Sequence, residues 1–381
     1  MKTQRAIQQF SVNRAAFERE LSFVSMAGET KTTIPILSTV KLDAADGILK
    51  LTATNLDVTA QSQVEIDASP STAICVDLRR LLALVKNMGE GEILLSIEPD
   101  RLQLKSGRSK FSLNGRNPDD FPNVEVVEGQ SLELHTSALK AMLTTAARAV
   151  DKEVSRFGTN ALAFIVTKGR AVMIGCDQKM VVKAEVDLDI DVNIGVGLLR
   201  AFFPALSSLF SSPGSRTTCV VGERAVKFQN GMRAVSGGLM ATKLFDYDLF
   251  FNKKREPLCE FDRVDFQQAL SRLLVMSDET EKGLKPMSLA LTDGQIEIAT
   301  EAKDAGAGND GFAVTDYVSD YKCRSNAMNF RVLLDVCWSP RIRMSGNSDS
   351  SRFDAEWAIS DSLNLRFAAL SMHMANPKGG K

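Results

Sequence analysis

The residues able to do chemistry in this 381-residue chain do not have the spacings that catalysis requires. There are two histidines, His135 and His373, and we interpret each as a helix cap or a surface residue. The segment GAGNDG at 306–311 fits the pattern G-x-G-x-x-G, but it joins one predicted strand to another, whereas the dinucleotide fingerprint requires a helix behind the glycines. We therefore expect a loose hairpin tip here and no nucleotide site.

Other signatures of enzymes and metal sites are also missing from the sequence. It contains no H-E-x-x-H, no P-loop and no G-x-S-x-G, and its six cysteines are scattered without a C-x-x-C pair, as is typical of reduced thiols in a cytosol. We expect no catalytic residue, no metal and no cofactor. The N-terminal MKTQRAIQQF lacks an apolar targeting region and no apolar run approaches about 18 residues, so we expect a cytoplasmic protein without a membrane span.

The formal net charge is −1, so binding of nucleic acid would depend on a local concentration of basic residues. Six segments have the apolar periodicity of helices: 13–25, 77–89, 136–150, 194–208, 262–275 and 326–338. Together they contain 11 Lys or Arg and 6 Asp or Glu, a net charge of +5, which leaves −6 for the rest of the chain. Either these are ordinary solvated helix faces, or the six helices line one basic surface that attracts phosphates without reading sequence.

Three segments share one template and begin 122 and 127 residues apart: VNRAAFEREL (12–21), LHTSALKAML (134–143) and FDRVDFQQAL (261–270). In each, an apolar residue ends an alternating strand, a polar residue follows as a helix cap, and the later apolar residues fall on one helical face. A turn glycine recurs in phase at Gly47, Gly169 and Gly294. A second helix followed by further strands also recurs.

These repeats predict an α+β fold of three similar domains, at residues 1–128, 129–256 and 257–381. Each domain would pack two amphipathic helices on one face of an antiparallel sheet. We expect proline-containing linkers near 116–130 and 252–258.

The chain resembles the bacterial DNA polymerase III beta subunit, the replicative sliding clamp family. The likeness rests on segments from all three repeats: TIPILSTVKL (33–42), DGILKLTATNLDVTAQ (46–61), SGRSKFSL (106–113), DFPN (120–123), SRFGTNALAF (155–164), ATKLFDYDLF (241–250), VLLDV (332–336) and FAALSMHM (367–374). The resemblance implies two crescents joined head to tail into a ring, with sheets outside and helices lining a hole for duplex DNA. It also implies that the clamp tethers polymerase and other replication or repair proteins for processivity, and that a clamp loader is a partner.

The resemblance and the predicted helices together give the candidate DNA-binding residues. Those that match basic residues of the family are Lys31, Arg79, Arg80 and Lys86, although Arg80 could instead serve the dimer boundary. Those chosen for their place in or beside a predicted helix are Arg148, Lys152, Arg200 and Lys282. Each contact would be weak and exchangeable, so that the ring slides, and retention on DNA would come from closure of the ring.

The same resemblance implies a dimer interface and a peptide-binding cleft. At the interface, Phe111 would lie on an edge strand framed by Arg108 and Lys110, opposite Val275 and Met276, although Phe111 could instead pack within its own sheet. The cleft between the second and third domains would be lined by Cys176, Gln178, Lys179, Met180, Val181, Phe250, Lys254, Leu370, Ser371 and Met372.

Departures from the family occur in this cleft, at CDQKMV (176–181), LFFN (249–252) and LSM (370–372). They indicate a changed peptide preference, a degraded site or an accessory clamp. The main alternative function is therefore a clamp-fold scaffold that docks peptides without a main replicative role, and an unrelated monomeric α/β binding protein is a more distant one.

Overall fold

The structure is a computed structural model, and it describes most of the chain. The described residues are 8–29, 32–68, 71–151, 159–177, 179–190, 192–212, 214–241, 244, 246–280, 283–302, 306–360 and 363–374. Four predicted site residues, Lys31, Lys152, Gln178 and Lys282, lie outside these ranges. None of the described helices is both long enough and apolar enough to span a bilayer.

Among the described residues, the order strand, helix, four strands, helix, three strands occurs three times, interrupted only by short 3-10 turns and by the four-residue helix α5 (Asp248–Phe251). Repeat 1 contains β1 (Gln8–Asn13), α1 (Arg14–Val24), β2 (Thr39–Ala45), β3 (Ile48–Thr54), β4 (Val58–Glu65), β5 (Thr72–Asp77), α2 (Leu78–Asn87), β6 (Glu92–Glu98), β7 (Arg101–Ser106) and β8 (Ser109–Arg116). Repeat 2 contains β9 (Gln130–His135), α3 (Thr136–Ala146), β10 (Ala161–Thr167), β11 (Arg170–Cys176), β12 (Met180–Asp187), β13 (Ile194–Leu199), α4 (Phe203–Phe210), β14 (Arg216–Val221), β15 (Ala225–Asn230) and β16 (Arg233–Gly238). Repeat 3 contains β17 (Glu256–Asp262), α6 (Arg263–Val275), β18 (Pro286–Thr292), β19 (Gln295–Ala302), β20 (Gly306–Ala313), β21 (Tyr321–Asn326), α7 (Ala327–Val336), β22 (Arg341–Gly346), β23 (Ser350–Ser360) and β24 (Leu363–Met372).

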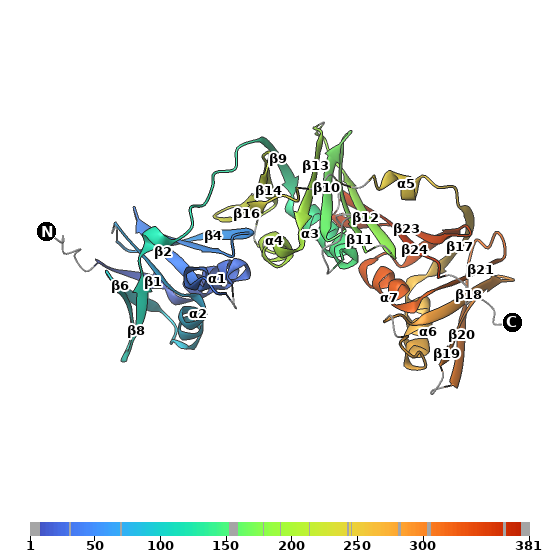
Figure 1. Cartoon of the computed structure of the whole chain (residues 1–381), viewed down its shortest axis with the longest axis horizontal. Coiled ribbons are helices and arrows are strands. Elements are labelled where there is room, and N and C mark those ends of the chain that lie inside the picture. The colour runs from blue at the N-terminus through green and yellow to red at the C-terminus, as the bar shows by residue number, and fades with distance from the viewer. Residues whose placement is uncertain are drawn as a thin grey trace. The chain divides into compact units, whose positions relative to one another are not determined.

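The chain divides into two compact units, and the division runs through repeat 2. Unit 1 comprises Met1–Thr136 and Ala201–Leu239, and unit 2 comprises Ser137–Arg200 and Met240–Lys381. Unit 1 contains one sheet in the order β1-β6-β7-β8-β5-β2-β3-β4-β16-β15-β14-β9, and unit 2 contains the sheets β13-β10-β11-β12-β24-β23-β22-β17 and β20-β19-β18-β21 (Figure 1). The predicted α+β class with helices on antiparallel sheets is confirmed, while the three-domain division stays a prediction.

Each repeat uses the same strand pairing. Its first strand joins its last three, as in β1-β6-β7-β8, and its other four strands form a second set, as in β5-β2-β3-β4. The hairpins inside the second sets turn at Asp46–Gly47, Lys168–Gly169 and Asp293–Gly294, where both residues have positive φ of 50° to 78°. Positive φ at both positions defines a type I′ turn, which explains why glycine recurs there.

The first helix of repeats 1 and 3 begins at a predicted cap. Asn13 Oδ1 accepts a hydrogen bond from Ala16 N at 3.1 Å, and Asp262 Oδ1 accepts one from Val264 N at 2.7 Å. The apolar face of α1 then buries Phe17 and Leu21 against β3 and β4. The burial of these two side chains on one face agrees with the helical periodicity of apolar residues in the sequence.

One predicted helix is wrong over most of its length. The window 194–208 begins with IGVGLL, which forms strand β13 paired with β10, and a 3-10 turn (Arg200–Phe202) precedes the short α4. A short apolar run does not distinguish a buried strand from a helix, and the two glycines and the valine here favour the strand. Arg200 therefore lies in a turn.

Two smaller predictions also change. GAGNDG is not a hairpin tip, because Gly306–Ala313 forms strand β20 paired along its length with β19. The linker expected at 252–258 ends earlier, since β17 begins at Glu256 and Pro257 sits beside a bulge in its pairing with β22. Glycine-rich sequence suggested a loop, but the pairing with β19 supplies backbone hydrogen bonds that glycine can form as well as any residue.

Candidate functional site

Basic side chains on the helices divide into those bound within the fold and those without a bonded partner. Arg14 donates to the carbonyl oxygens of Val85 at 3.1 Å and Lys86 at 2.7 Å, at the C-terminal end of α2. Arg263 donates in the same way to Ser339 O at 3.1 Å, just beyond α7. Both arginines begin the first helix of their repeat, so this position serves to satisfy the end of the neighbouring helix.

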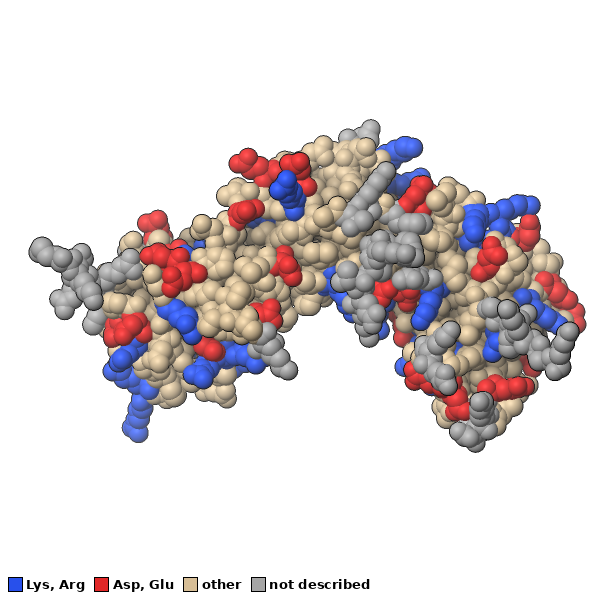
Figure 2. Space-filling view, viewed as in Figure 1, with Lys and Arg blue, Asp and Glu red and all other residues tan. Residues whose placement is uncertain are grey.

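The exposed face of α2 contains three of the candidate DNA-binding residues. Arg79, Arg80 and Lys86 are exposed, while Leu81 and Val85 on the opposite face are fully buried. Within the described residues, none of the three side chains has a hydrogen bond or an ion pair. Figure 2 shows basic side chains gathered over α2 and over the β7–β8 hairpin of unit 1. Free cations on one helix face are available to bind phosphates.

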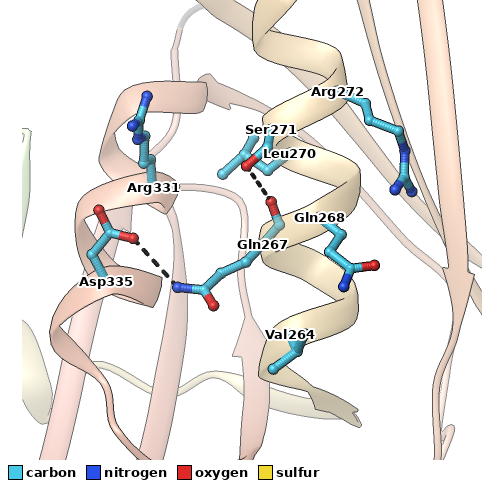
Figure 3. A pocket seen from close by; sticks show the side chains of 8 residues that line it. All are labelled: Val264, Gln267, Gln268, Leu270, Ser271, Arg272, Arg331 and Asp335. Atoms are coloured by element: carbon cyan, nitrogen blue, oxygen red, sulfur yellow. Dashed lines mark hydrogen bonds between the residues drawn. The ribbon is translucent and has the colours of Figure 1, made fainter.

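In unit 2, the helices α6 and α7 enclose a groove of about 480 Å³. Figure 3 shows Gln267 of α6 and Asp335 of α7 pointing toward one another across it, with Gln267 Nε2 3.3 Å from Asp335 Oδ1. Arg331 is exposed beside the groove and has no bonded partner in the described chain. Arg272 points away from α7 and forms an ion pair with Asp310 of β20 at 2.5 Å. Arg331 is therefore the available cation of this helix pair.

The other candidates from the second repeat differ from one another. Arg148 is exposed in the turn after α3 and, among the described residues, has no bonded partner. Arg200 donates from Nη1 to Val150 O at 2.9 Å, so part of its hydrogen-bonding capacity is used within unit 2. Lys140, which the sequence interpretation did not single out, is exposed on α3 and unpaired in the described structure.

The repeats join through one kind of strand pairing. In unit 1, β4 of repeat 1 pairs antiparallel with β16, the last strand of repeat 2. In unit 2, β12 of repeat 2 pairs antiparallel with β24, the last strand of repeat 3. The strands β4, β12 and β20 hold the same position in repeats 1, 2 and 3, and β8, β16 and β24 are the last strands of these repeats. A further pairing of this kind would therefore join β20 of repeat 3 to β8 of repeat 1.

Both of these strands have an edge without a partner in the described structure. β20 pairs only with β19, and β8 pairs with β7 along its length but with β5 only at Arg116 and Gly115. Phe111 on β8 is 39% exposed, and Val275 at the end of α6 is 81% exposed. Unpaired edges with exposed apolar side chains favour association with another chain.

The charges beside these two edges are opposite. The β7–β8 hairpin exposes Lys105, Arg108 and Lys110, whereas β19 exposes Glu297 and Glu301. Figure 2 shows basic atoms at the tip of that hairpin, and acidic atoms over β19 and β20. Opposite charges on two surfaces favour their contact and disfavour contact of either surface with itself.

The predicted peptide cleft corresponds to an apolar cluster on one face of the eight-stranded sheet. Cys176, Val181 and Leu370 form its buried floor, because β11, β12 and β24 are neighbours and Val181 pairs with both other residues. Phe250 and Met372 pack against the cluster and are partly exposed. These five predicted residues are thus brought together in the fold.

The helix α5 covers part of this cluster and was not expected from the sequence. It presents Phe251, and the preceding Tyr247 is also buried, so two aromatic rings lie over the apolar floor. Burial raises the pKa of Tyr247 to about 12. Lys183 Nζ lies 5.1 Å from the centre of the Phe251 ring, and Arg352 donates to Phe251 O at 3.1 Å. These contacts hold α5 on the sheet.

Two predicted cleft residues lie on the other face of the same sheet. Met180 belongs to the buried core that includes Phe330, and Ser371 Oγ is 2.9 Å from Ser325 Oγ. Side chains alternate along a strand, so Met180 and Ser371 cannot share a face with Val181. The prediction that they line the cleft is corrected accordingly. Lys179 and Lys254 are both exposed near the cluster, and Lys254 pairs with Glu256 at 2.9 Å.

His373, which we expected to be a cap or a surface residue, is partly buried and is bonded within the fold. Its Nδ1 lies 3.0 Å from Ser348 O and its Nε2 lies 2.8 Å from the hydroxyl of Tyr321, so the neutral ring donates from Nδ1 and accepts at Nε2. Burial lowers the pKa of His373. The histidine therefore fastens the end of β24 to β21 and to the turn before β23.

Comparisons with known proteins agree with this architecture. Residues 8–125 match the family model described as DNA polymerase III beta subunit, N-terminal domain. The beta sliding clamp of Pseudomonas putida is 26% identical over 335 residues, 86% of this chain and 89% of that protein. The beta sliding clamp of Vibrio harveyi is 35% identical over 118 residues, 30% of this chain and 81% of that sequence.

Solved structures give the same result for the fold. A sliding clamp of Pseudomonas aeruginosa bound to griselimycin superimposes with a TM-score of 0.89 at 23% identity, covering 97% of this chain and 99% of that one. A sliding clamp of Bacillus subtilis gives a TM-score of 0.88 at 17% identity, covering 98% and 100%. The solved structures show the same fold, and the relative at 35% identity, of whose sequence the chain covers 81%, shows that the chain belongs to the DNA polymerase III beta subunit family, the sliding clamps, which are non-catalytic processivity factors.

Proposed function

We propose that two copies of the chain close head to tail into a ring around duplex DNA and tether replication proteins to it. The single observation that supports closure best is the repeated strand junction. Two of the three possible junctions, β4 with β16 and β12 with β24, form within the chain. The third, β20 with β8, requires a second copy, and two copies would satisfy each other's edges with none left over.

The junction in unit 1 suggests a register for this contact. There Val235, the third residue of β16, faces Ala60, the third residue of β4. The third residues of β8 and β20 are Phe111 and Gly308. A Cβ added to Gly308 would lie 3.3 Å from Met276 Cβ, so a phenylalanine facing Gly308 would meet Met276. This register brings together the predicted interface residues Phe111, Met276 and the neighbouring Val275.

DNA would be held by weak contacts with the free helix cations. Arg79, Arg80 and Lys86 of unit 1, with Arg148 and Arg331 of unit 2, have no bonded partner among the described residues and offer charge without a shaped base-reading surface. Such contacts exchange readily, so the protein would slide while the closed ring prevents dissociation. Lys31, Lys152 and Lys282 lie outside the described residues and remain candidate contacts from the sequence. Arg200 lies in a turn, not in the predicted helix, and remains a candidate through the guanidinium nitrogens that do not bind Val150 O.

The apolar cluster beneath α5 would bind short peptides of the polymerase, the clamp loader and repair proteins. Its partly exposed members Phe250 and Met372 would be the contact points, because apolar anchors in a shallow groove are typical of extended-peptide recognition. A cytoplasmic, nucleoid-associated location follows from this role.

Retention on circular DNA tests the proposal. The protein is loaded on nicked circular plasmid with a clamp loader, and the complex is isolated by gel filtration in high salt. A ring stays bound to the circle and leaves when a restriction enzyme linearises it. Equal loss from circular and linear DNA would exclude encirclement, and peptide binding without retention would favour the scaffold role.

A further inference from the structure

Both tryptophans of the chain line the same pocket in unit 2. Trp338 follows α7 and is 67% exposed, and Trp357 lies in β23 with its ring centre 6.1 Å from that of Phe367. The pocket has a volume of about 300 Å³. Its remaining lining comes from α3 and from the end of β23: Ser137, Lys140, Ala141, Thr144, Thr145, Ala358 and Ile359. We call it the tryptophan pocket.

The described lining of the tryptophan pocket has a net positive charge. Lys140 is the only ionisable residue among the described lining residues, and within the described chain it has no ion pair. Asp335 of α7 and Glu356 of β23 accept hydrogen bonds from Gln267 at 3.3 Å and Asn364 at 3.1 Å, and neither is among the described lining residues of the pocket. A ligand for this pocket would therefore combine a flat apolar part with a negative charge.

Lys140 of repeat 2 has no equivalent lysine in repeats 1 and 3. The template that aligns the first helices places Glu18 of α1 and Gln267 of α6 at the position of Lys140. Glu18 pairs with Arg14 at 2.9 Å, and Gln267 hydrogen bonds across to α7, so both are used in internal contacts. Lys140 has neither function, which leaves it available for a ligand.

We propose that the tryptophan pocket binds an unpaired nucleotide of DNA, with the base stacked on Trp338 and the phosphate beside Lys140. An exposed indole next to a free cation is the combination used for single strands, where any base can stack and the backbone is bound by charge. Bases inside a duplex are already stacked on each other and cannot use the indole. The hydroxyl of Ser137 adds a hydrogen-bond donor for phosphate or sugar oxygens, whereas the Thr144 hydroxyl already donates to Lys140 O at 2.8 Å. The proposal rests on the clamp role, because it makes this pocket a contact for single-stranded segments beside the encircled duplex.

An acidic peptide with an aromatic side chain is the competing ligand, and the chain's composition makes the two easy to distinguish. Because the only two tryptophans line this pocket, tryptophan fluorescence reports on it selectively. A short oligothymidylate should quench the fluorescence to saturation, while the same length of duplex and an acidic, phenylalanine-containing peptide should not. Saturation by the peptide and not by the oligothymidylate would overturn the proposal.

Two variants assign the effect to the residues. Trp338→Ala should weaken oligothymidylate binding on the order of tenfold, measured by anisotropy of a labelled oligonucleotide. Lys140→Gln should reduce the salt dependence of binding, whereas Lys50→Gln, which removes an exposed lysine of β3, should leave it unchanged. Unchanged affinity of Trp338→Ala, with unchanged retention on circular plasmid as proof of folding, would refute the site. If the native protein is not retained on circular plasmid but its fluorescence is still quenched by oligothymidylate, the ring is refuted and the nucleotide site in the pocket is not.

Discussion

Arg233 of β16 forms a two-point ion pair with Glu20 of α1, with Nε 2.7 Å from Oε2 and Nη2 2.9 Å from Oε1. Ser62 of β4 also donates to the Glu20 carboxylate, and the Arg233 guanidinium lies 4.9 Å from the Phe23 ring centre. The pair is largely buried, and it joins a helix of repeat 1 to the last strand of repeat 2 where β4 meets β16. The junction that we propose to recur between two copies is thus fastened inside unit 1 by a charged contact as well as by backbone hydrogen bonds.

Removing one partner of this pair should destabilise unit 1 strongly. Arg233→Met removes the buried counter-charge of the Glu20 carboxylate and leaves only the exposed Arg19, 2.8 Å away, at a cost of roughly 3–5 kcal/mol of unfolding free energy. Urea unfolding followed by circular dichroism measures the loss. The double variant Glu20→Gln with Arg233→Met should recover part of it, and Arg170→Met, at an exposed and longer ion pair, should cost at most about 1 kcal/mol. Equal losses for Arg170→Met and Arg233→Met would contradict the assignment.

The same carboxylate should make unit 1 acid-sensitive. Burial has the largest effect and raises the pKa of Glu20, but hydrogen bonds from Arg233, Ser62 and Arg19 outweigh it and lower the pKa below the ordinary 4.5. A lowered folded-state pKa gives stability that is complete above 4.5 and is lost as the pH falls through the lowered value. Unfolding titrations between neutral pH and strong acid should therefore be steeper below 4.5 for the native chain than for Glu20→Gln. Parallel curves would show that Glu20 does not titrate as proposed.

Phe111→Asp should convert the proposed dimer to monomers. The substitution adds a negative charge to an apolar edge that would face β20 and the acidic surface of β19. Sedimentation equilibrium gives the mass directly. Met232→Asp is the matched control, because Met232 is also an exposed apolar residue in a hairpin of unit 1 but lies outside the proposed junction. A dimer mass for Phe111→Asp would exclude β8 from the interface.

Lys86→Glu should weaken DNA association without changing the dimer mass. If Lys86 contacts one phosphate, its loss reduces the slope of log affinity against log salt by about one. Lys50→Glu makes the same charge change on a strand instead of a helix, and it should leave the slope unaltered. A slope for Lys86→Glu that matches the native chain would remove α2 from the DNA-facing surface.

Phe250→Asp should abolish binding of a polymerase-derived peptide. Phe250 packs on the apolar cluster of Val181 and Leu370, so a carboxylate there would be desolvated by the peptide. The neighbouring Leu249 on the same helix is 60% exposed and lies outside the cluster, and Leu249→Asp should bind normally. Fluorescence anisotropy of a labelled peptide compares the two. Similar affinities would place the peptide site elsewhere.

Much of the fold was predictable because the same pattern of caps, turn glycines and helices occurs three times, and each pattern would be weak evidence if it occurred once. Caps at Asn13 and Asp262, turn glycines such as Gly47, and the strands after each second helix occur where the sequence indicated. The errors fall where composition is ambiguous. IGVGLL forms a strand because β10 lies beside it, and GAGNDG forms a strand because β19 pairs with it. The composition of neither segment specifies this pairing.

The amino-acid sequence by itself determined most of the order of helices and strands, the threefold repetition and the family, since propensity, periodicity and turn chemistry act over a few neighbouring residues. Only the tertiary structure decided which cations are free and which side chains share a face. Arg14 and Arg272 look like Lys86 in the sequence, yet the first satisfies the end of α2 and the second pairs with Asp310. Met180 is next to Val181 in the sequence but faces the opposite side of the sheet. Such assignments depend on long-range strand pairing and helix packing, which place residues far apart in the chain within bonding distance.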